Sequence, residues 1–201
     1  MRPILEKLII TALFWVFVLS NSTAQTIKLV NSSFEETPQD ATMPAGWHSC
    51  KTGTTPDILP GFWGVTTEAF DGETYMGLIT RENGTWESIE QRLNEPLKKG
   101  ECYAFDIKLC YSKQYAGYNL PLKLRIWGSE TKCSRDQLLT ETPFVKHTYW
   151  KKYDLNFTVK QNINYIIIEA HYADGVFIPY KGNILIDDIS EIGMCKRASL
   201  Y

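Results

Sequence analysis

Acidic residues near the two ends of the chain lie beside residues that normally form a hydrophobic core. Glu35 follows an aromatic residue in NSSFEE (31–36), and Asp187 interrupts the apolar segment NILIDDISEI (183–192). If the first and last strands of the fold are neighbours, these two carboxylates meet, and each raises the pKa of the other unless a cation lies between them. Calcium takes six to eight oxygen ligands, including backbone carbonyls. We therefore expect a structural calcium between them, completed by carbonyls of the turn FDGETY (70–75).

A second group of candidate side chains occupies alternate positions of three apolar segments, 101–112, 120–128 and 164–172. This alternation is typical of strands with one face in the core. If the three strands share a sheet, their outward positions form a polar surface with one indole: Asp106, Arg125, Trp127, Glu169 and His171. A planar aromatic ring with polar neighbours suits a sugar. The alternative is a solvated sheet face with cross-strand ion pairs.

Aromatic residues in turns provide a further candidate surface, because loops on a rigid scaffold commonly bind ligands. The turns PGFWG (60–64) and NGTW (83–86) each present an indole, and the segment 111–119 is rich in tyrosine. Within these turns we rank three side chains as the best exposed candidates for ligand binding: Trp63, Tyr115 and Tyr118. Trp47 and Trp150 are expected in the core.

The residue pattern does not predict catalysis. The GxSxG motif is absent, and the three histidines lack metal-ligand spacing. Asp106 and Glu169 could serve as a glycosidase pair, but nothing in the sequence marks either acid as special. We expect that the protein is not an enzyme.

The elements that must position these residues are strands and turns. Five segments with strand patterning alternate with turns rich in glycine and proline, and only SRDQLLTE (134–141) has helical character. This pattern predicts an all-β fold, a β-sandwich of the jelly-roll type. Residues 25–201 are expected to form a single domain, because no repeat or linker divides them.

Residues 1–24 are predicted to be a signal peptide. An apolar run, LIITALFWVFVL (8–19), follows two basic residues and precedes small residues. It is too short for a comfortable membrane span, although an uncleaved N-terminal anchor is the rival interpretation. No second membrane segment follows. We expect a secreted or exported protein.

Charge and cysteine content limit the partners and the compartment. The formal net charge is −2, so nucleic acid is not an expected partner. Export favours disulfides, but the odd number of cysteines leaves at least one unpaired, and the pairing stays open. The cysteines are Cys50, Cys102, Cys110, Cys133 and Cys195.

The order and spacing of four segments resemble those of a known family. The segments are LVNSSFEE (29–36), DGETYMGL (71–78), LKKGECYAFDIKL (97–109) and ILIDDIS (184–190). They are similar to the galactose-binding-like jelly-roll domains, which include CenC-type carbohydrate-binding modules. The greatest similarity is to exported gliding-motility-associated domains of Bacteroidetes.

The resemblance implies a structural calcium near the two ends of the domain. By position, its acidic ligands fall on Glu35 and Asp187, and its carbonyl ligands lie around Glu73. Glu36 and Asp188 stay open as alternatives, and the acids could instead be capped by turn amides.

We therefore predict a non-catalytic, exported module that binds carbohydrate, such as a cell-envelope glycan. The alternative is a protein-interaction or structural component of a cell-surface machinery of the gliding type. The sequence leaves open the final compartment: periplasm, outer surface or medium.

Overall fold

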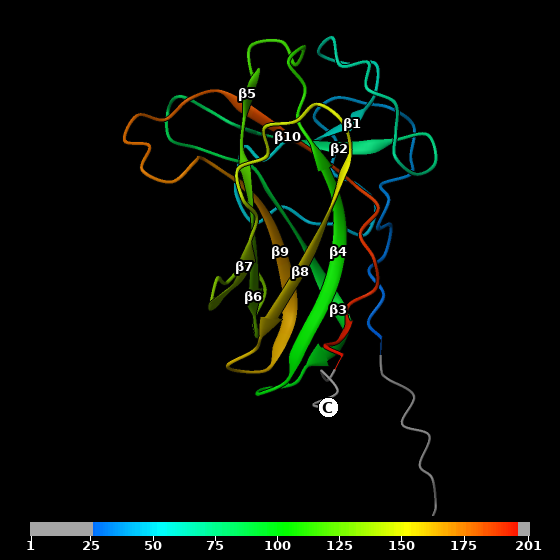
Figure 1. Ribbon diagram of the computed structural model, residues 1–201, viewed down its shortest axis with the longest axis vertical. Helices are drawn as coiled ribbons and strands as arrows, with labels where there is room; N and C mark the ends of the chain where they lie inside the picture. Colours follow the sequence, from blue (N-terminus) through cyan, green and yellow to red (C-terminus); the bar gives the residue numbers. More distant parts are fainter. Residues whose placement is uncertain (1–25, 197–201) are drawn as a thin grey trace, which may run out of the picture.

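Two β-sheets packed face to face make up the protein in the computed structural model, which describes residues 26–196 (Figure 1). This arrangement confirms the predicted all-β sandwich. The predicted signal peptide, and the rival anchor, lie outside the described residues. Within residues 26–196, no helix is long and apolar enough to cross a membrane. The described strands are β1 (Asp57–Leu59), β2 (Tyr75–Thr80), β3 (Ser88–Leu97), β4 (Cys102–Cys110), β5 (Leu120–Pro121), β6 (Lys123–Ser129), β7 (Gln137–Glu141), β8 (Lys151–Thr158), β9 (Ile163–His171), β10 (Gly182–Asp187) and β11 (Gly193–Met194).

The two sheets differ in size. The larger has seven strands in the order β1-β2-β10-β4-β11, with β5 paired to β10 and β8 paired to β4. The smaller has four strands in the order β3-β9-β6-β7. Because β4 belongs to the larger sheet and β6 and β9 to the smaller, the three segments that we expected in one sheet are divided between two.

The core lies between the sheets and follows the predicted alternation. Leu122, Leu124 and Ile126 are fully buried, and Trp47 is buried with them as expected. A second apolar cluster lies on the other side of the seven-stranded sheet, beneath the loops that follow β1 and β4. Trp150 packs partly buried against this second cluster.

The beginning and the end of the described chain are neighbours. Ile27 and Ile192 exchange two backbone hydrogen bonds, each with a nitrogen to oxygen distance of 2.9 Å. The blue and red ends of the ribbon accordingly run along the same edge of the molecule (Figure 1). The first and last segments of the described chain are therefore neighbours, as the meeting of Glu35 and Asp187 requires.

The helical character assigned to residues 134–141 is wrong. Residues 137–141 form the edge strand β7, in which Leu138 pairs with Trp127 of β6. A local preference for helix is weak, and pairing to an existing strand edge supplies backbone hydrogen bonds that override it.

The cysteine pairing is decided by the fold. Cys50 is bonded to Cys133 and Cys102 to Cys195, while Cys110 is a free, buried thiol. Burial raises the pKa of Cys110, which keeps its thiol protonated and unreactive. The bridge to Cys195 joins the start of β4 to the C-terminal end of the described chain.

The Cys102–Cys195 bridge closes a loop with a sequence separation of 93 residues. Replacing both cysteines by alanine is expected to lower the free energy of unfolding by about 3–5 kcal/mol, because the unfolded chain gains conformational freedom. Urea unfolding followed by tryptophan fluorescence measures the change. As a control on the pairing, the unmodified protein should expose one thiol to a colorimetric thiol reagent, and only after unfolding. Three or more thiols would contradict the two bridges.

Candidate functional site

The outer face of the four-stranded sheet, on the side away from the core, carries four of the predicted ligand-binding side chains. In the register between β6 and β9, Arg125 lies opposite Glu169, Trp127 opposite Ile167, and Lys123 opposite His171. Their neighbours in sequence, such as Leu124 and Ile126, point into the core. Arg125, Trp127, Glu169 and His171 therefore share one surface, as the alternation predicted.

Asp106 does not belong to this surface, which corrects our expectation. It lies on β4 in the other sheet, and its carboxylate accepts a hydrogen bond from the Lys108 ammonium at 2.7 Å. The alternation along the strand correctly indicated that the Asp106 side chain points away from the core. Alternation does not reveal, however, which sheet a strand joins.

Glu169 is bonded to protein groups and only 1% exposed. The Trp127 indole nitrogen donates to one carboxylate oxygen at 3.2 Å, and the Arg135 guanidinium donates to the other at 2.8 Å. Arg135 also donates to the Ser88 hydroxyl at 3.2 Å. Glu169 thus holds other side chains in position and is not free to bond a ligand.

Arg125 and His171 lie toward the open end of the same face. Arg125 is half-buried and approaches Glu141 at 3.4 Å. Burial and the nearby Arg125 lower the pKa of His171, so its imidazole is neutral at pH 7. The ion pair between Arg125 and Glu141 joins two neighbouring strands. Part of this face is therefore a sheet surface with cross-strand ion pairs, which was the alternative to a sugar site.

A short segment, residues 130–136, covers the part of the outer face near β3; we call it the strap. Its Cys133 is bonded to Cys50, and the Cys133 backbone N–H donates to the buried Glu90 carboxylate at 2.6 Å. Ile167 is fully buried although it lies on the outer face. The strap therefore closes the middle of this face, and the open part is the end that carries His171.

At that end lies an open hollow of about 610 Å³ beside the indole of Trp86; we call it the Trp86 hollow. Its lining comes from two segments, 51–55 and 81–86. The indole packs edge-on against His171 with ring centroids 5.1 Å apart, and the Lys51 ammonium lies 4.2 Å above the ring centroid. Ligand pockets for small molecules typically measure about 300–1,000 Å³, so this hollow has room for a sugar residue.

The turn RENGTW explains why Trp86 is held at this place. The Arg81 backbone N–H donates to the Thr85 carbonyl, and Gly84 adopts a φ of 81°, which favours glycine. The Asn83 carboxamide oxygen accepts from both the N–H and the hydroxyl of Thr85. The sequence analysis predicted a turn at this place.

Directly behind Trp86, the buried carboxylate of Glu87 joins the two segments that line the hollow. It accepts hydrogen bonds from Arg81 at 2.6 Å, from the Thr55 backbone N–H at 3.1 Å and from the Ile79 backbone N–H at 3.1 Å. Burial raises the pKa of Glu87 to about 7, against the opposing effect of Arg81. Sequence reasoning missed Glu87, because a single acid after an aromatic residue gives no signal of burial.

The favoured loop aromatics lie on the far side of the sandwich, around the second apolar cluster. Trp63 is 45% exposed, in agreement with the prediction. Tyr115 is only 1% exposed, and its hydroxyl donates to the buried Asp57 carboxylate, so its predicted exposure is wrong. Tyr118 packs partly buried against Tyr115. The tyrosines of the loop 111–119 therefore pack into the second apolar cluster and do not form an exposed binding surface.

The predicted metal ligands converge on one turn, residues 70–74. The Glu35 carboxylate accepts the backbone N–H groups of Glu73 at 3.0 Å and Thr74 at 3.3 Å. The Asp187 carboxylate accepts those of Phe70 at 2.7 Å and Asp71 at 3.1 Å. Burial raises the pKa of Asp187 to about 6. The two acids thus meet the same turn, and its backbone amides cap both of them, which is the alternative that the sequence left open.

The neighbouring acids are engaged elsewhere. The Glu36 carboxylate accepts from the Asn31 side-chain amide at 2.9 Å, and Asp188 forms an ion pair with Lys108 at 3.0 Å. Glu73 has an exposed side chain. Among residues 26–196, the side-chain oxygens of Glu35, Glu73 and Asp187 do not gather into a three-ligand cluster, so a cation there needs backbone carbonyls.

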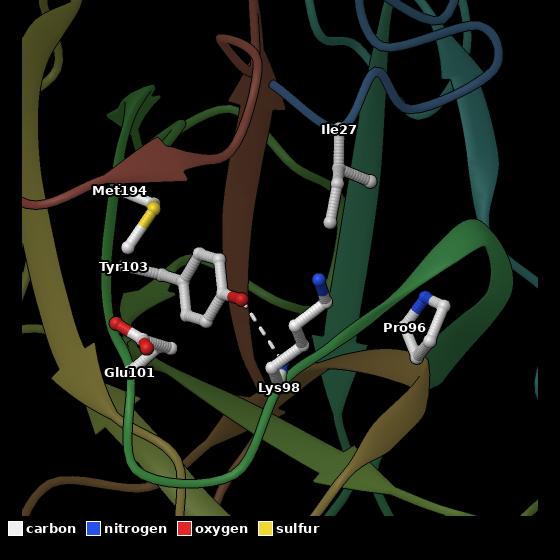
Figure 2. A pocket seen from close by; sticks show the side chains of 6 residues that line it. All are labelled: Ile27, Pro96, Lys98, Glu101, Tyr103 and Met194. Carbon is white, nitrogen blue, oxygen red and sulfur yellow. Dashed lines mark hydrogen bonds between the residues drawn. The ribbon is translucent and has the colours of Figure 1, made fainter. Parts of the chain in front are cut away.

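A smaller hollow lies near the two ends of the described part of the chain (Figure 2). It measures about 120 Å³, and in Figure 2 Tyr103 and Met194 face Ile27 across it. The Tyr103 hydroxyl accepts the Lys98 backbone N–H at 2.9 Å. This volume is below the usual range for ligand pockets, so the Trp86 hollow is the better candidate site.

The amino-acid sequence matches a known protein family. A sequence model of the family CBM_4_9, described as a carbohydrate binding domain, matches residues 28–175. A comparison with curated proteins found no match.

Several solved structures share the fold. The CBM22-1 xylan-binding domain of Xyn10C from Paenibacillus barcinonensis is 16% identical, with 87% of this chain and 97% of that chain covered and a TM-score of 0.54. The arabinose-bound α-L-arabinofuranosidase MgGH51 is 13% identical with a TM-score of 0.58, and the match covers 86% of this chain but 27% of that one. The K3 cleaved adhesin domain of Lys-gingipain from Porphyromonas gingivalis W83 is 14% identical, with 85% and 98% covered and a TM-score of 0.50. At such identities the likeness is one of fold.

The bond between Arg135 and Glu169 is expected to hold the strap to the sheet. Arg135→Ala should lower the free energy of unfolding by about 3 kcal/mol, because it leaves the buried Glu169 charge without its partner. The double variant Arg135→Ala, Glu169→Gln should lose less, because glutamine carries no charge. Denaturant unfolding checks both. Lys152→Ala is the control, since its ion pair with Asp154 is exposed and contributes little. Equal losses in the single and double variants would contradict this role.

Proposed function

Because the chain belongs to the carbohydrate binding domain family CBM_4_9, we propose that this non-catalytic module binds its glycan at the Trp86 hollow. The adjoining end of the outer sheet face, with His171, Arg125 and Trp127, extends this site. The proposal refines the predicted sheet-face site, since the strap leaves only one end of that face open.

One observation carries the proposal: a tryptophan ring borders an open hollow of about 610 Å³, and polar groups surround it. An indole covers the apolar face of a pyranose, while hydroxyl and amide groups bond its hydroxyls. The hollow offers Thr55, Asn83 and Thr85 beside Trp86. The rigid turn 81–86 holds these groups in place, which reduces the entropy lost on binding.

The compartment follows from the same family and from the disulfides. A carbohydrate-binding domain with two disulfides belongs outside the cytoplasm, where oxidising conditions preserve them. We propose a cell-envelope glycan as the ligand. A signal peptide over residues 1–24 is consistent with this placement.

A protein partner at the cell surface is the alternative function, and one feature favours it. The loop between β9 and β10, orange in Figure 1, projects from the sandwich. Within this loop, Phe177 is 95% exposed and Ile178 is 79% exposed. Consecutive exposed apolar side chains are unusual and often mark an interaction surface. Such a contact would fit a structural component of a surface machinery of the gliding type.

We also propose that a structural calcium lies between Glu35, Asp187 and the turn 70–74. The carboxylate oxygens of Glu35 and Asp187 support the proposal. Each keeps lone pairs that the turn amides do not use, and these lone pairs can bind a cation. Asp187 is buried and, among the described residues, has no basic partner. A bound calcium would supply positive charge for both acids. Carbonyls around Glu73 would complete its shell.

Trp86→Ala is expected to weaken glycan binding about 10- to 100-fold, the usual effect of removing a central aromatic contact. The measurement begins with a glycan array of the purified protein, followed by calorimetry on the best ligand. Tyr149→Ala is the matched control, because Tyr149 is an exposed aromatic away from the hollow. Normal binding by the Trp86 variant, with loss in a Trp127→Ala variant, would move the site along the sheet face. Silence of the unmodified protein on the array, together with capture of a surface protein that Phe177→Ser abolishes, would favour the alternative function.

Calcium is expected to raise the melting temperature by several degrees over a chelator, because a ligand that binds only the folded state stabilises it. The variant Glu35→Gln, Asp187→Asn should melt at a lower temperature and no longer respond to calcium. Magnesium serves as the control, since it demands a stricter octahedral shell. Identical melting of the unmodified protein in calcium and in chelator would remove the metal.

A further inference from the structure

The charges of the Trp86 hollow differ in sign from those of the chain as a whole. The chain has a formal net charge of −2, yet the residues that line the hollow include two cations, Lys51 and Arg81, and no acid. Among the described residues, Lys51 forms no ion pair. The partner of Arg81, Glu87, lies fully buried behind the hollow. The nearby Glu82 is paired with Lys181 at 3.2 Å. Because Glu87 compensates Arg81, Lys51 gives the hollow its uncompensated positive charge.

Two buried hydrogen-bonding groups beside the hollow lack a partner within the described part of the protein. Within residues 26–196, two buried side-chain polar atoms lack a hydrogen-bond partner, the Trp86 indole nitrogen and the Thr54 hydroxyl oxygen. Both belong to the two segments that line the hollow. Buried polar groups are nearly always bonded, so each orphan needs an explanation such as a ligand or ordered water. The indole N–H can only donate, and it requires an acceptor.

We propose that the Trp86 hollow binds an acidic sugar, a pyranose that carries a carboxylate or a sulfate. This inference rests on the proposed function and names the ligand class for the same site. The ammonium of Lys51 and the guanidinium of Arg81 receive the anionic group.

The positions of the two cations suit this ligand. Lys51 is an exposed, flexible side chain whose ammonium stands over the indole ring, so it can follow a ligand that enters beside the ring. Arg81 is fixed by its bonds to Glu87 and to the Thr55 hydroxyl, which keeps its planar guanidinium at one wall of the hollow. A fixed guanidinium recognises carboxylate and sulfate through charge-assisted hydrogen bonds. A neutral sugar would leave the Lys51 ammonium without an anionic partner.

The test compares ligands that differ only in charge. Calorimetry of the intact purified protein uses polygalacturonate against its methyl ester for the carboxylate arm, and a sulfated galactan against the desulfated polymer for the sulfate arm. In at least one arm the acidic form should bind about tenfold more tightly than its neutral counterpart. This preference should fall as sodium chloride screens the charges. The arm that responds identifies the anionic group.

Two variants test the residues. Lys51→Gln should weaken binding of the acidic polymer about fivefold more than it weakens binding of the neutral form, because only the acidic form carries the charge that Lys51 receives. Lys181→Gln is the matched control, since it removes the same charge from a neighbouring exposed lysine that does not line the hollow. Equal binding of the acidic and neutral polymers would overturn the proposal. So would a Lys51 variant that matches the control.

The outcomes also separate this inference from the proposed function. If a neutral glycan binds and Trp86→Ala abolishes that binding, the hollow is a sugar site and the acidic-sugar inference is wrong. If no glycan of either charge binds, both the proposed function and this inference are overturned.

Discussion

Burial of carboxylates is the constraint on which the arrangement of this protein depends. A charged group removed from water must be surrounded by donors, or it destabilises the fold by several kcal/mol. Three loop segments supply most of these donors: 51–55, 70–74 and 130–136. The buried acids that they serve lie on or beside the sheets and are Glu87, Glu90, Glu169 and Asp187. Each acid therefore fixes a loop that has little apolar surface of its own.

The two faces of the four-stranded sheet show how this constraint shapes the surface. Its inner face is apolar and forms the core, as the alternation of β6 and β9 requires. Its outer face carries buried acids, and it needs a cover that can donate hydrogen bonds. The strap provides this cover through Arg135 and the Cys133 backbone, and the Cys50–Cys133 bridge keeps it in place. A broad open sheet face is thereby reduced to a hollow at one end.

The hollow depends on the same physical interaction. Glu87 takes hydrogen bonds from the segment 51–55 and from Arg81, so a single carboxylate sets the distance between the two walls. Trp86 precedes it in sequence, and its indole is supported from the side by His171 and Tyr172. Glu87 also binds the Arg81 guanidinium, so Lys51 is the lining cation that has no acidic partner among the described residues. The interaction that stabilises the walls thus also orients the guanidinium at the hollow.

The sequence by itself determined the strands, their inward and outward faces, the turns, and the meeting of the first and last acidic segments. These features follow from side-chain alternation and turn chemistry, which are local properties of the chain. Residues 134–141 show the limit of such reasoning, since a weak helical preference gave way to pairing with β6. Only the tertiary structure decided that Asp106 and Arg125 lie in different sheets, that Tyr115 is buried, and which cysteines pair. Sheet membership, loop burial and disulfide pairing depend on contacts between residues far apart in sequence, and alternation carries no information about such contacts.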